Sequence, residues 1–381
     1  MARVSVAWAN LVHERTRLVV AIAGVAFAVV LIFMNLGFMG ALIATATNFY
    51  EQFNADLFLI SPETLEISTS TAFPRERLYQ VAGLEGVEHV MPLYSEYLLW
   101  RNPETGVSRA IFVYGINPND PVFLMPELQG EDARRILSQP DTVFMDRFSR
   151  PEFGPQEIGT TTEADRRRAT IGGTYFLGGG FAADGTLIMS DQNFVRYLEP
   201  RPLSLVNVGL IKLKPGVSPT KVAAAMRPLL PADVNIYTKA GIIEHDSTYW
   251  LESTSIGFIF SMGVVVSFVV GAVIVYQILF TDIRDHLPEY ATMKAMGYRS
   301  QYLFKIVLQE AVFLAVLGYL PGLAAALGLY HLTTTATAGT LPVAMNGGRV
   351  LFVLGLTLLM CCLSGLISVR KAINTDPAEI F

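Results

Sequence analysis

The chain is poor in charged residues and in cysteine for a length of 381 residues. Only 16% of its residues are charged, whereas an average soluble domain has about 25%, so we expect that much of the chain does not face water. Its two cysteines, Cys361 and Cys362, are adjacent in an apolar stretch. Neighbouring cysteines exclude a disulfide framework and predict two small buried side chains. The net charge of −5 argues against a nucleic-acid partner.

The usual catalytic and metal-binding patterns are also missing. There is no Walker A motif, so we predict that the chain is not an enzyme and holds no cofactor of its own. It has no G-x-S-x-G nucleophile elbow, and its five histidines lack metal-ligand spacing. The glycines at 178–180 are not followed by the Lys-Ser/Thr of a phosphate loop and predict a turn. Three other carboxylates are expected to be solvated: Asp191, Glu244 and Asp246.

Four long apolar windows are the main feature that the chain does have. A spanning helix needs about 20 residues, and the first window, Leu18 to Tyr50, has 33 without a charge. We therefore predict a first span whose helix continues outward as a stalk. A cleaved signal peptide is the alternative, but its apolar region would run only about 7–15 residues. The other windows are Ser253–Thr281, about Ile306–Tyr330 and Val350–Val369.

The positions of Lys and Arg predict the orientation of the spans. Basic residues gather before the first window, between the second and third, and after the fourth, whereas residues 331–349 have one Arg and no Lys. Both termini are therefore expected to be cytoplasmic. The basic residues concerned are Arg3, Arg15, Arg17, Arg284, Lys294, Arg299, Lys305, Arg370 and Lys371.

The segment between the first two spans is long enough to bury its own core. It begins and ends with strand–helix–strand patterns, 55–93 and 206–238, which predict one split α+β module. The stretch between them has further strand patterns and is expected to be an insert. The fold class is thus a membrane protein of four transmembrane helices with a large extracytoplasmic α+β domain between helices 1 and 2.

The predicted boundaries follow from these windows and patterns. They are an interfacial N-terminal helix 1–17; transmembrane helix 1 with its stalk 18–43; the extracytoplasmic domain 44–252 (split module 44–101 and 203–245, insert 102–202); helix 2, 253–281; a cytoplasmic loop 282–304; helix 3, 305–330; a short extracytoplasmic loop 331–349; helix 4, 350–369; and a cytoplasmic tail 370–381.

One acidic residue, Glu310, lies inside a predicted span. Intramembrane carboxylates often serve ion-coupled transport. A proton relay needs several such groups, so we expect Glu310 to snorkel to the interface or to pair with a basic residue on a neighbouring helix.

The loop TDIRDHLPEYATMKAMGYRS resembles the cytoplasmic loop of FtsX/MacB-like ABC permeases. In that family an acidic residue, a small-residue stretch, a Lys, an Ala and a Gly recur in this order. The matching positions are Glu289, Ala291, Lys294, Ala295 and Gly297. Other segments are similar to the DevC branch of the family, and the resemblance covers essentially the whole chain: AWANLVHERTRLVVAIAGVAFA, FMDRFSRPEFGP and the terminal TDPAEIF.

The resemblance implies a homodimer in the bacterial inner membrane, served by two copies of a separate ABC ATPase that binds ATP and magnesium. It also implies a periplasmic adaptor (a membrane fusion protein) and a TolC-like outer-membrane channel. MacB-like permeases transmit ATP-driven motion to their periplasmic domain, which drives cargo through the adaptor. The implied function is export of a lipid or another amphiphile; the alternative is a membrane receptor or signalling protein regulated by an ABC-type ATPase.

A short helix in the same loop would couple the permease to its ATPase. Apolar side chains would grip the partner and charged ones would orient it; a helix packed on its own bundle is the alternative. The expected coupling residues are Leu287, Glu289, Tyr290, Met293, Lys294, Ala295, Met296, Gly297, Tyr298 and Arg299.

Overall fold

The computed structural model describes residues 15–177, 184–286, 288, 296, 300–337 and 341–373. The chain divides into two compact units. The first contains the long helices and comprises the residues before Leu42, residues 255–339 and the residues from Val343 onward. The second comprises Leu42–Thr254 and residues 340–342.

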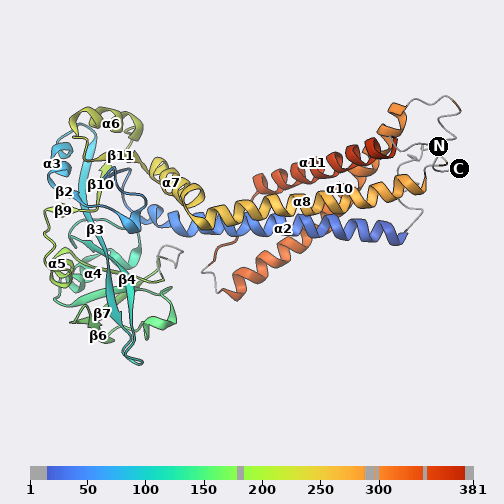
Figure 1. Cartoon of the computed structure of the whole chain (residues 1–381). Coiled ribbons are helices and arrows are strands. Elements are labelled where there is room, and N and C mark those ends of the chain that lie inside the picture. Colours follow the sequence, from blue (N-terminus) through green and yellow to red (C-terminus); the bar gives the residue numbers. More distant parts are fainter. Residues whose placement is uncertain are drawn as a thin grey trace. The chain divides into compact units, whose positions relative to one another are not determined.

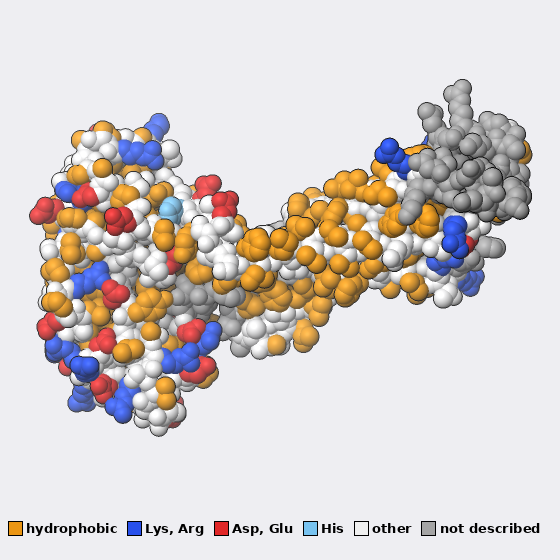
Figure 2. Space-filling view, in the orientation of Figure 1, with side chains coloured by type: hydrophobic (Ala, Val, Ile, Leu, Met, Phe, Trp, Pro, Cys, Tyr) orange, Lys and Arg blue, Asp and Glu red, His pale blue; other side chains and the backbone are white. Residues whose placement is uncertain are grey.

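The described residues of the first unit lie mainly in four long helices (Figure 1). They are α2 (Arg15–Thr47), α8 (Ser255–Asp285), α10 (Ser300–Ala336) and α11 (Gly347–Ile373). Each is long and apolar enough to cross a membrane. Figure 2 shows the visible face of this unit covered by apolar side chains, as expected for a surface in contact with lipid. The predicted fold class is confirmed by these helices and by the α+β domain between α2 and α8.

Glycines bring the helices of this unit close together. A Cβ on Gly318 or Gly322 of α10 would lie 2.4 or 2.8 Å from the Cβ of Val25 or Val29 on α2. The two glycines are four residues apart, the spacing at which small residues let two membrane helices approach. The two glycines therefore form part of the α2–α10 contact.

The second unit is built on a nine-stranded sheet. Its first four strands are antiparallel in the order β11-β1-β10-β3. This is the order of a split β-α-β module whose two halves come from distant parts of the chain. The strands are β1 (Leu57–Ile60), β3 (Val87–Arg101), β10 (Val208–Leu213) and β11 (Asn235–Thr238), with helices α3 (Glu76–Ala82) and α6 (Pro219–Met226) between them.

The remaining five strands extend the same sheet from β3 in the order β4-β8-β5-β7-β6. The last of them pairs with β3 again, at Trp100 and Ala164, which closes six strands into a ring. The Trp100 indole lies buried and donates a hydrogen bond to the Phe153 carbonyl. The strands are β4 (Ser108–Ile116), β5 (Thr142–Asp146), β6 (Thr161–Ala164), β7 (Arg167–Tyr175) and β8 (Thr186–Ser190).

Shorter elements complete this domain. A small second sheet pairs β2 (Phe73–Pro74) with β9 (Leu205–Val206). The helices α4 (Glu131–Leu137), α5 (Asp191–Tyr197) and α7 (Lys239–Thr248) lie outside the sheet. A 3₁₀ helix (Asn48–Gln52) follows α2, and a single π-helical turn (Tyr249–Ser253) follows α7.

Candidate functional site

The predicted coupling loop lies almost entirely outside the described residues. This holds for Leu287, Glu289, Tyr290, Met293, Lys294, Ala295, Gly297, Tyr298 and Arg299, and also for Ala291 and for the interfacial segment before Arg15. Among the expected coupling residues, Met296 is described, and its side chain is 65% exposed. The role of the loop therefore stays a prediction.

The end of α8 that leads into this loop is described and is joined by charge to the start of α2. Arg17, near the beginning of α2, donates to Asp285 at the end of α8, with 2.7 Å between Nη2 and Oδ2. Its other terminal nitrogen lies 3.8 Å from Asp282, whose side chain is buried. The ion pair links the first span to the helix that leads into the loop, a pairing that charge counting along the sequence did not reveal.

Glu310 lies on α10 with its side chain completely buried, at 0% exposure. The carboxylate therefore does not reach the surface of the helical unit. The expected snorkelling of Glu310 to the membrane interface is not observed.

Hydroxyl groups connect α11 to the same helix α8. Ser364 donates to the carbonyl of Ala272 at 2.8 Å, and Ser368 donates to the carbonyl of Tyr276 at 3.2 Å. Inside a membrane such interhelical hydrogen bonds stabilise packing because the alternative is an unsatisfied group in hydrocarbon. The two bonds make α8 and α11 one packed pair, so a displacement of α8 would be shared by α11.

In the outer domain, a buried hydrogen bond joins the two segments that lead to the membrane helices. The hydroxyl of Tyr50, just after α2, donates to Oδ2 of Asp246 in α7 at 2.6 Å, across 196 residues of sequence. Asp246 is 1% exposed and also accepts from the backbone N–H of Ile67 at 3.3 Å. Nδ1 of His245 lies 3.0 Å from its other oxygen.

This cluster corrects one prediction from the sequence. Asp246 and Asp191 are buried, and of the three carboxylates that were expected to be solvated, Glu244 alone is exposed. Burial raises the pKa of Asp191, which lies in the first turn of α5. No local sequence pattern marks Asp246 as buried, because its burial depends on a tyrosine from the far end of the domain.

Aromatic rings surround Tyr50 and fix it in the domain. Its ring lies 5.4 Å from that of Phe58 in an edge-to-face arrangement and 4.2 Å from that of Phe49. Phe53 stacks on Phe123 at 5.1 Å. Such pairs add stability beyond their buried area, so the chain that leaves α2 is held firmly against the β-sheet.

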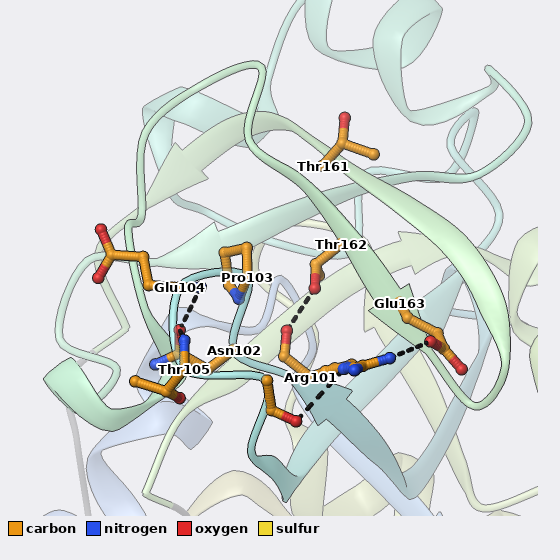
Figure 3. A pocket seen from close by; sticks show the side chains of 9 residues that line it. Arg101, Asn102, Pro103, Glu104, Thr105, Thr161, Thr162 and Glu163 are labelled. Carbon is orange, nitrogen blue, oxygen red and sulfur yellow. Dashed lines mark hydrogen bonds and ion pairs between the residues drawn. The ribbon is translucent and has the colours of Figure 1, made fainter.

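An open, polar pocket of about 480 Å³ lies where β3 and β6 diverge (Figure 3). The guanidinium of Arg101 bridges to Glu163 at 3.0 Å and to the carbonyl of Gly106 at 3.3 Å. The Asn102 side chain accepts from the N–H groups of Glu104 and Thr105 and so shapes the turn between β3 and β4. The pocket presents charges of both signs and has no buried apolar wall, which suits contact with a polar protein surface better than a small apolar ligand.

Within the described ranges, no group of three or more His, Cys, Asp or Glu side chains could hold a metal ion. The glycine turn predicted at 178–180 lies outside the described residues. The features with functional potential are thus the loop flanks, the Tyr50–Asp246 cluster and the polar pocket.

Comparisons with known proteins agree with this architecture. The family model of the MacB-like periplasmic core domain matches residues 18–229, more than half of the chain, and that of the FtsX-like permease C-terminal region matches residues 261–377. No curated protein matches the chain.

Two solved structures are similar to the outer part of the chain. The periplasmic region of MacB from Actinobacillus actinomycetemcomitans is 13% identical, with 51% of this chain and 92% of that chain covered and a TM-score of 0.38. The extracellular domain of the noncanonic ABC-type transporter YknZ from Gram-positive bacteria is 12% identical, with 48% and 100% covered and a TM-score of 0.35.

One family model covers the first span and most of the inserted domain, and the other covers the three later membrane helices. The chain therefore belongs to the FtsX/MacB-like family of permeases, the multi-pass membrane subunits of ABC transporters that carry an extracytoplasmic domain.

Proposed function

We propose that this permease is a DevC-type subunit of a tripartite exporter and moves lipid or other amphiphilic cargo by transmitting motion. In this proposal a homodimer in the inner membrane, with both termini cytoplasmic, works with two copies of a separate ATPase that binds ATP and magnesium. Its outer domain drives cargo into a periplasmic adaptor and a TolC-like outer-membrane channel.

The observation that best supports transmission is the Tyr50–Asp246 hydrogen bond. Tyr50 follows α2 directly and Asp246 lies in α7, which is separated from α8 only by the π-helical turn and Thr254. A buried bond between the two segments makes them move together as they enter the domain. Force from either membrane helix would then reach the β-sheet as a single displacement rather than as separate movements of two flexible linkers.

Both connections contain an irregular turn, which supports a hinged motion. At the end of α2 the chain departs from helical geometry at Thr47 (φ −131°, ψ −18°) and then forms a 3₁₀ turn that enters the aromatic cluster. Before α8 it passes through a π-helical turn and then the extended residue Thr254 (φ −105°, ψ 150°). Irregular helical turns often mark hinges. In the proposed cycle the junctions at Thr47 and at Thr254 both act as hinges.

The transmission step can be tested in proteoliposomes with the ATPase and the adaptor present. We expect Tyr50→Phe to preserve assembly and ATP hydrolysis but to lower ATP-dependent transfer of a fluorescent phospholipid to the adaptor several-fold. Tyr79→Phe, at an exposed tyrosine of α3, is the matched control and should behave as the wild type. Unchanged transfer by Tyr50→Phe would show that motion does not pass through this bond.

The partners can be tested by isolating the tagged chain from its native membrane in mild detergent. An ATPase with Walker motifs and a coiled-coil adaptor are the expected companions. An ATPase without an adaptor would favour the regulated receptor instead, and the absence of both would contradict the exporter.

A further inference from the structure

Arg349 lies at the start of α11, beside the end of α2 from which the chain continues into the inserted domain, and its side chain is held by several contacts. Its backbone N–H is capped by the Asn346 side chain at 2.7 Å, at the start of α11. Its Nη1 donates to the Ala344 carbonyl at 2.6 Å and to the Tyr330 hydroxyl at 3.4 Å. The Tyr330 hydroxyl in turn donates to the Phe33 carbonyl on α2.

Two glycines on α2 make room for this arrangement. A Cβ on Gly37 would lie 2.4 Å from the Tyr330 hydroxyl, and a Cβ on Gly40 would lie 2.2 Å from Nη2 of Arg349. The guanidinium therefore packs against the backbone of α2 at Gly40. Contacts with α2 and α10, together with its own helix α11, fix its position.

The charge of this guanidinium is not neutralised within the part of the chain that the structure describes. No carboxylate there lies within ion-pair distance of Arg349, and residues 331–349 contain no Asp or Glu. Of its five N–H donors, those on Nη1 bond to the protein, which leaves the Nε and Nη2 donors for another acceptor. A planar pair of donors of this kind fits two oxygens of a phosphate.

The depth of Arg349 indicates where the acceptor comes from. Gly40 lies 25 residues after Arg15 on α2, which is about 37 Å along a helix axis and exceeds the hydrocarbon core of about 30 Å. Arg349 beside it is at headgroup level. One turn deeper on α11, Phe352 is 56% exposed. The arginine at headgroup level and the apolar side chain below it therefore match the phosphate of a phospholipid and its acyl chains.

We propose that Arg349 binds the phosphate of a phospholipid in the leaflet next to the inserted domain, with the acyl chains against Phe352. The site stabilises the outer ends of α2, α10 and α11 at a fixed depth in the membrane. This proposal does not rest on the proposed export function, because phospholipid binding requires neither the ATPase nor the adaptor.

The test is native mass spectrometry of the full chain in detergent with phosphatidylglycerol, phosphatidylcholine or diacylglycerol added. We expect a tight site for both phospholipids and none for diacylglycerol. Arg349→Gln should weaken phospholipid binding about tenfold, equivalent to ~1.4 kcal/mol. Arg370→Gln, the same charge change at the other end of α11, should leave it unchanged.

A second variant keeps the test decisive if Arg349→Gln unfolds. Gly40→Ala retains the arginine but displaces its guanidinium and should weaken binding to a similar degree. Equal binding by all variants, or equal loss with Arg370→Gln, would overturn the proposal. Competition by inorganic phosphate at the lipid's own concentration would also overturn it, because the site would then bind free phosphate.

Discussion

Arg17, near the start of α2, forms a 2.7 Å ion pair with Asp285, at the end of α8 that leads into the predicted coupling loop. Both side chains are partly exposed, so the pair contributes only about 0.2–1 kcal/mol to stability. Its importance is geometric, because it ties the first span to the helix that would be displaced by the ATPase.

We therefore predict that Arg17→Asp lowers stimulation of the ATPase by the permease while stability changes little. The double variant Arg17→Asp, Asp285→Arg restores an attractive pair and should recover most of the stimulation. Recovery by the swap separates pairing from a general effect of charge; a swap that stays as impaired as the single variant would exclude the pairing as the cause.

The coupling loop can be tested independently of its conformation. Glu289→Lys reverses a charge that would orient the loop, and Gly297→Trp adds bulk at the predicted end of its helix. Each should leave the protein inserted and dimeric but abolish stimulation of ATP hydrolysis in reconstituted complexes. Normal stimulation in both variants would remove the coupling assignment.

The α2–α10 contact predicts a position-specific loss of stability. Gly318→Leu would place side-chain atoms where Val25 already packs, and overpacking costs typically ~1–3 kcal/mol. Gly328→Leu on the same helix is the control, since a Cβ there meets nothing within 4 Å. Thermal unfolding in detergent should show a lower midpoint for the first variant only.

The outer domain should lose stability in alkaline solution. Burial raises the pKa of Tyr94 from 10.0 to about 12, so the unfolded chain releases its proton at a lower pH than the folded domain does. The contribution of Tyr94 is therefore complete below pH 10 and is lost as the pH rises through about 12. Tyr94→Phe should reduce the fall in unfolding temperature between about pH 9 and about pH 11, whereas Tyr79→Phe should not. An identical fall in wild type and Tyr94→Phe would contradict this.

We predict that the adaptor docks on the insert 102–202, and this prediction is better tested by substitutions at the polar pocket than by deletion of the insert. Removing residues 102–202 would strip β4 from β3 along Leu93–Arg101 and expose the core beneath. Glu104→Lys and Glu163→Lys instead change the charge of the polar pocket (Figure 3) and should weaken adaptor binding in a pull-down. Glu131→Lys on α4, in the same insert, should not. Equal binding by all three would place the docking surface elsewhere.

The membrane part of the fold was predictable because long uncharged windows leave few alternatives. The inserted α+β domain also followed from strand–helix–strand patterns. The full length of β3 did not: its pattern was expected to end near Leu93, but the strand continues to Arg101. Its second half is held by β4 and β6, and pairing partners that lie elsewhere in the chain leave no mark on local propensity.

The functional features depend more strongly on contacts between distant residues. Asp246 is an ordinary polar residue in sequence and becomes part of a buried cluster only through Tyr50. Arg349 was counted as a loop charge, whereas its geometry depends on Tyr330, Gly37 and Gly40. In both cases the residue type was visible in the sequence and the partner was not.

The Trp100–Ala164 pairing has a consequence for how such domains coexist at a crowded membrane. Because it returns β6 to β3, β11 is the one strand of the main sheet, within the described residues, that has a neighbour on a single side. This strand is only four residues long. Exposed edges invite strand exchange and aggregation between copies, and short or closed ones suppress it. The ring thus acts as protection against unwanted self-association outside the cytoplasm, where many copies share one surface.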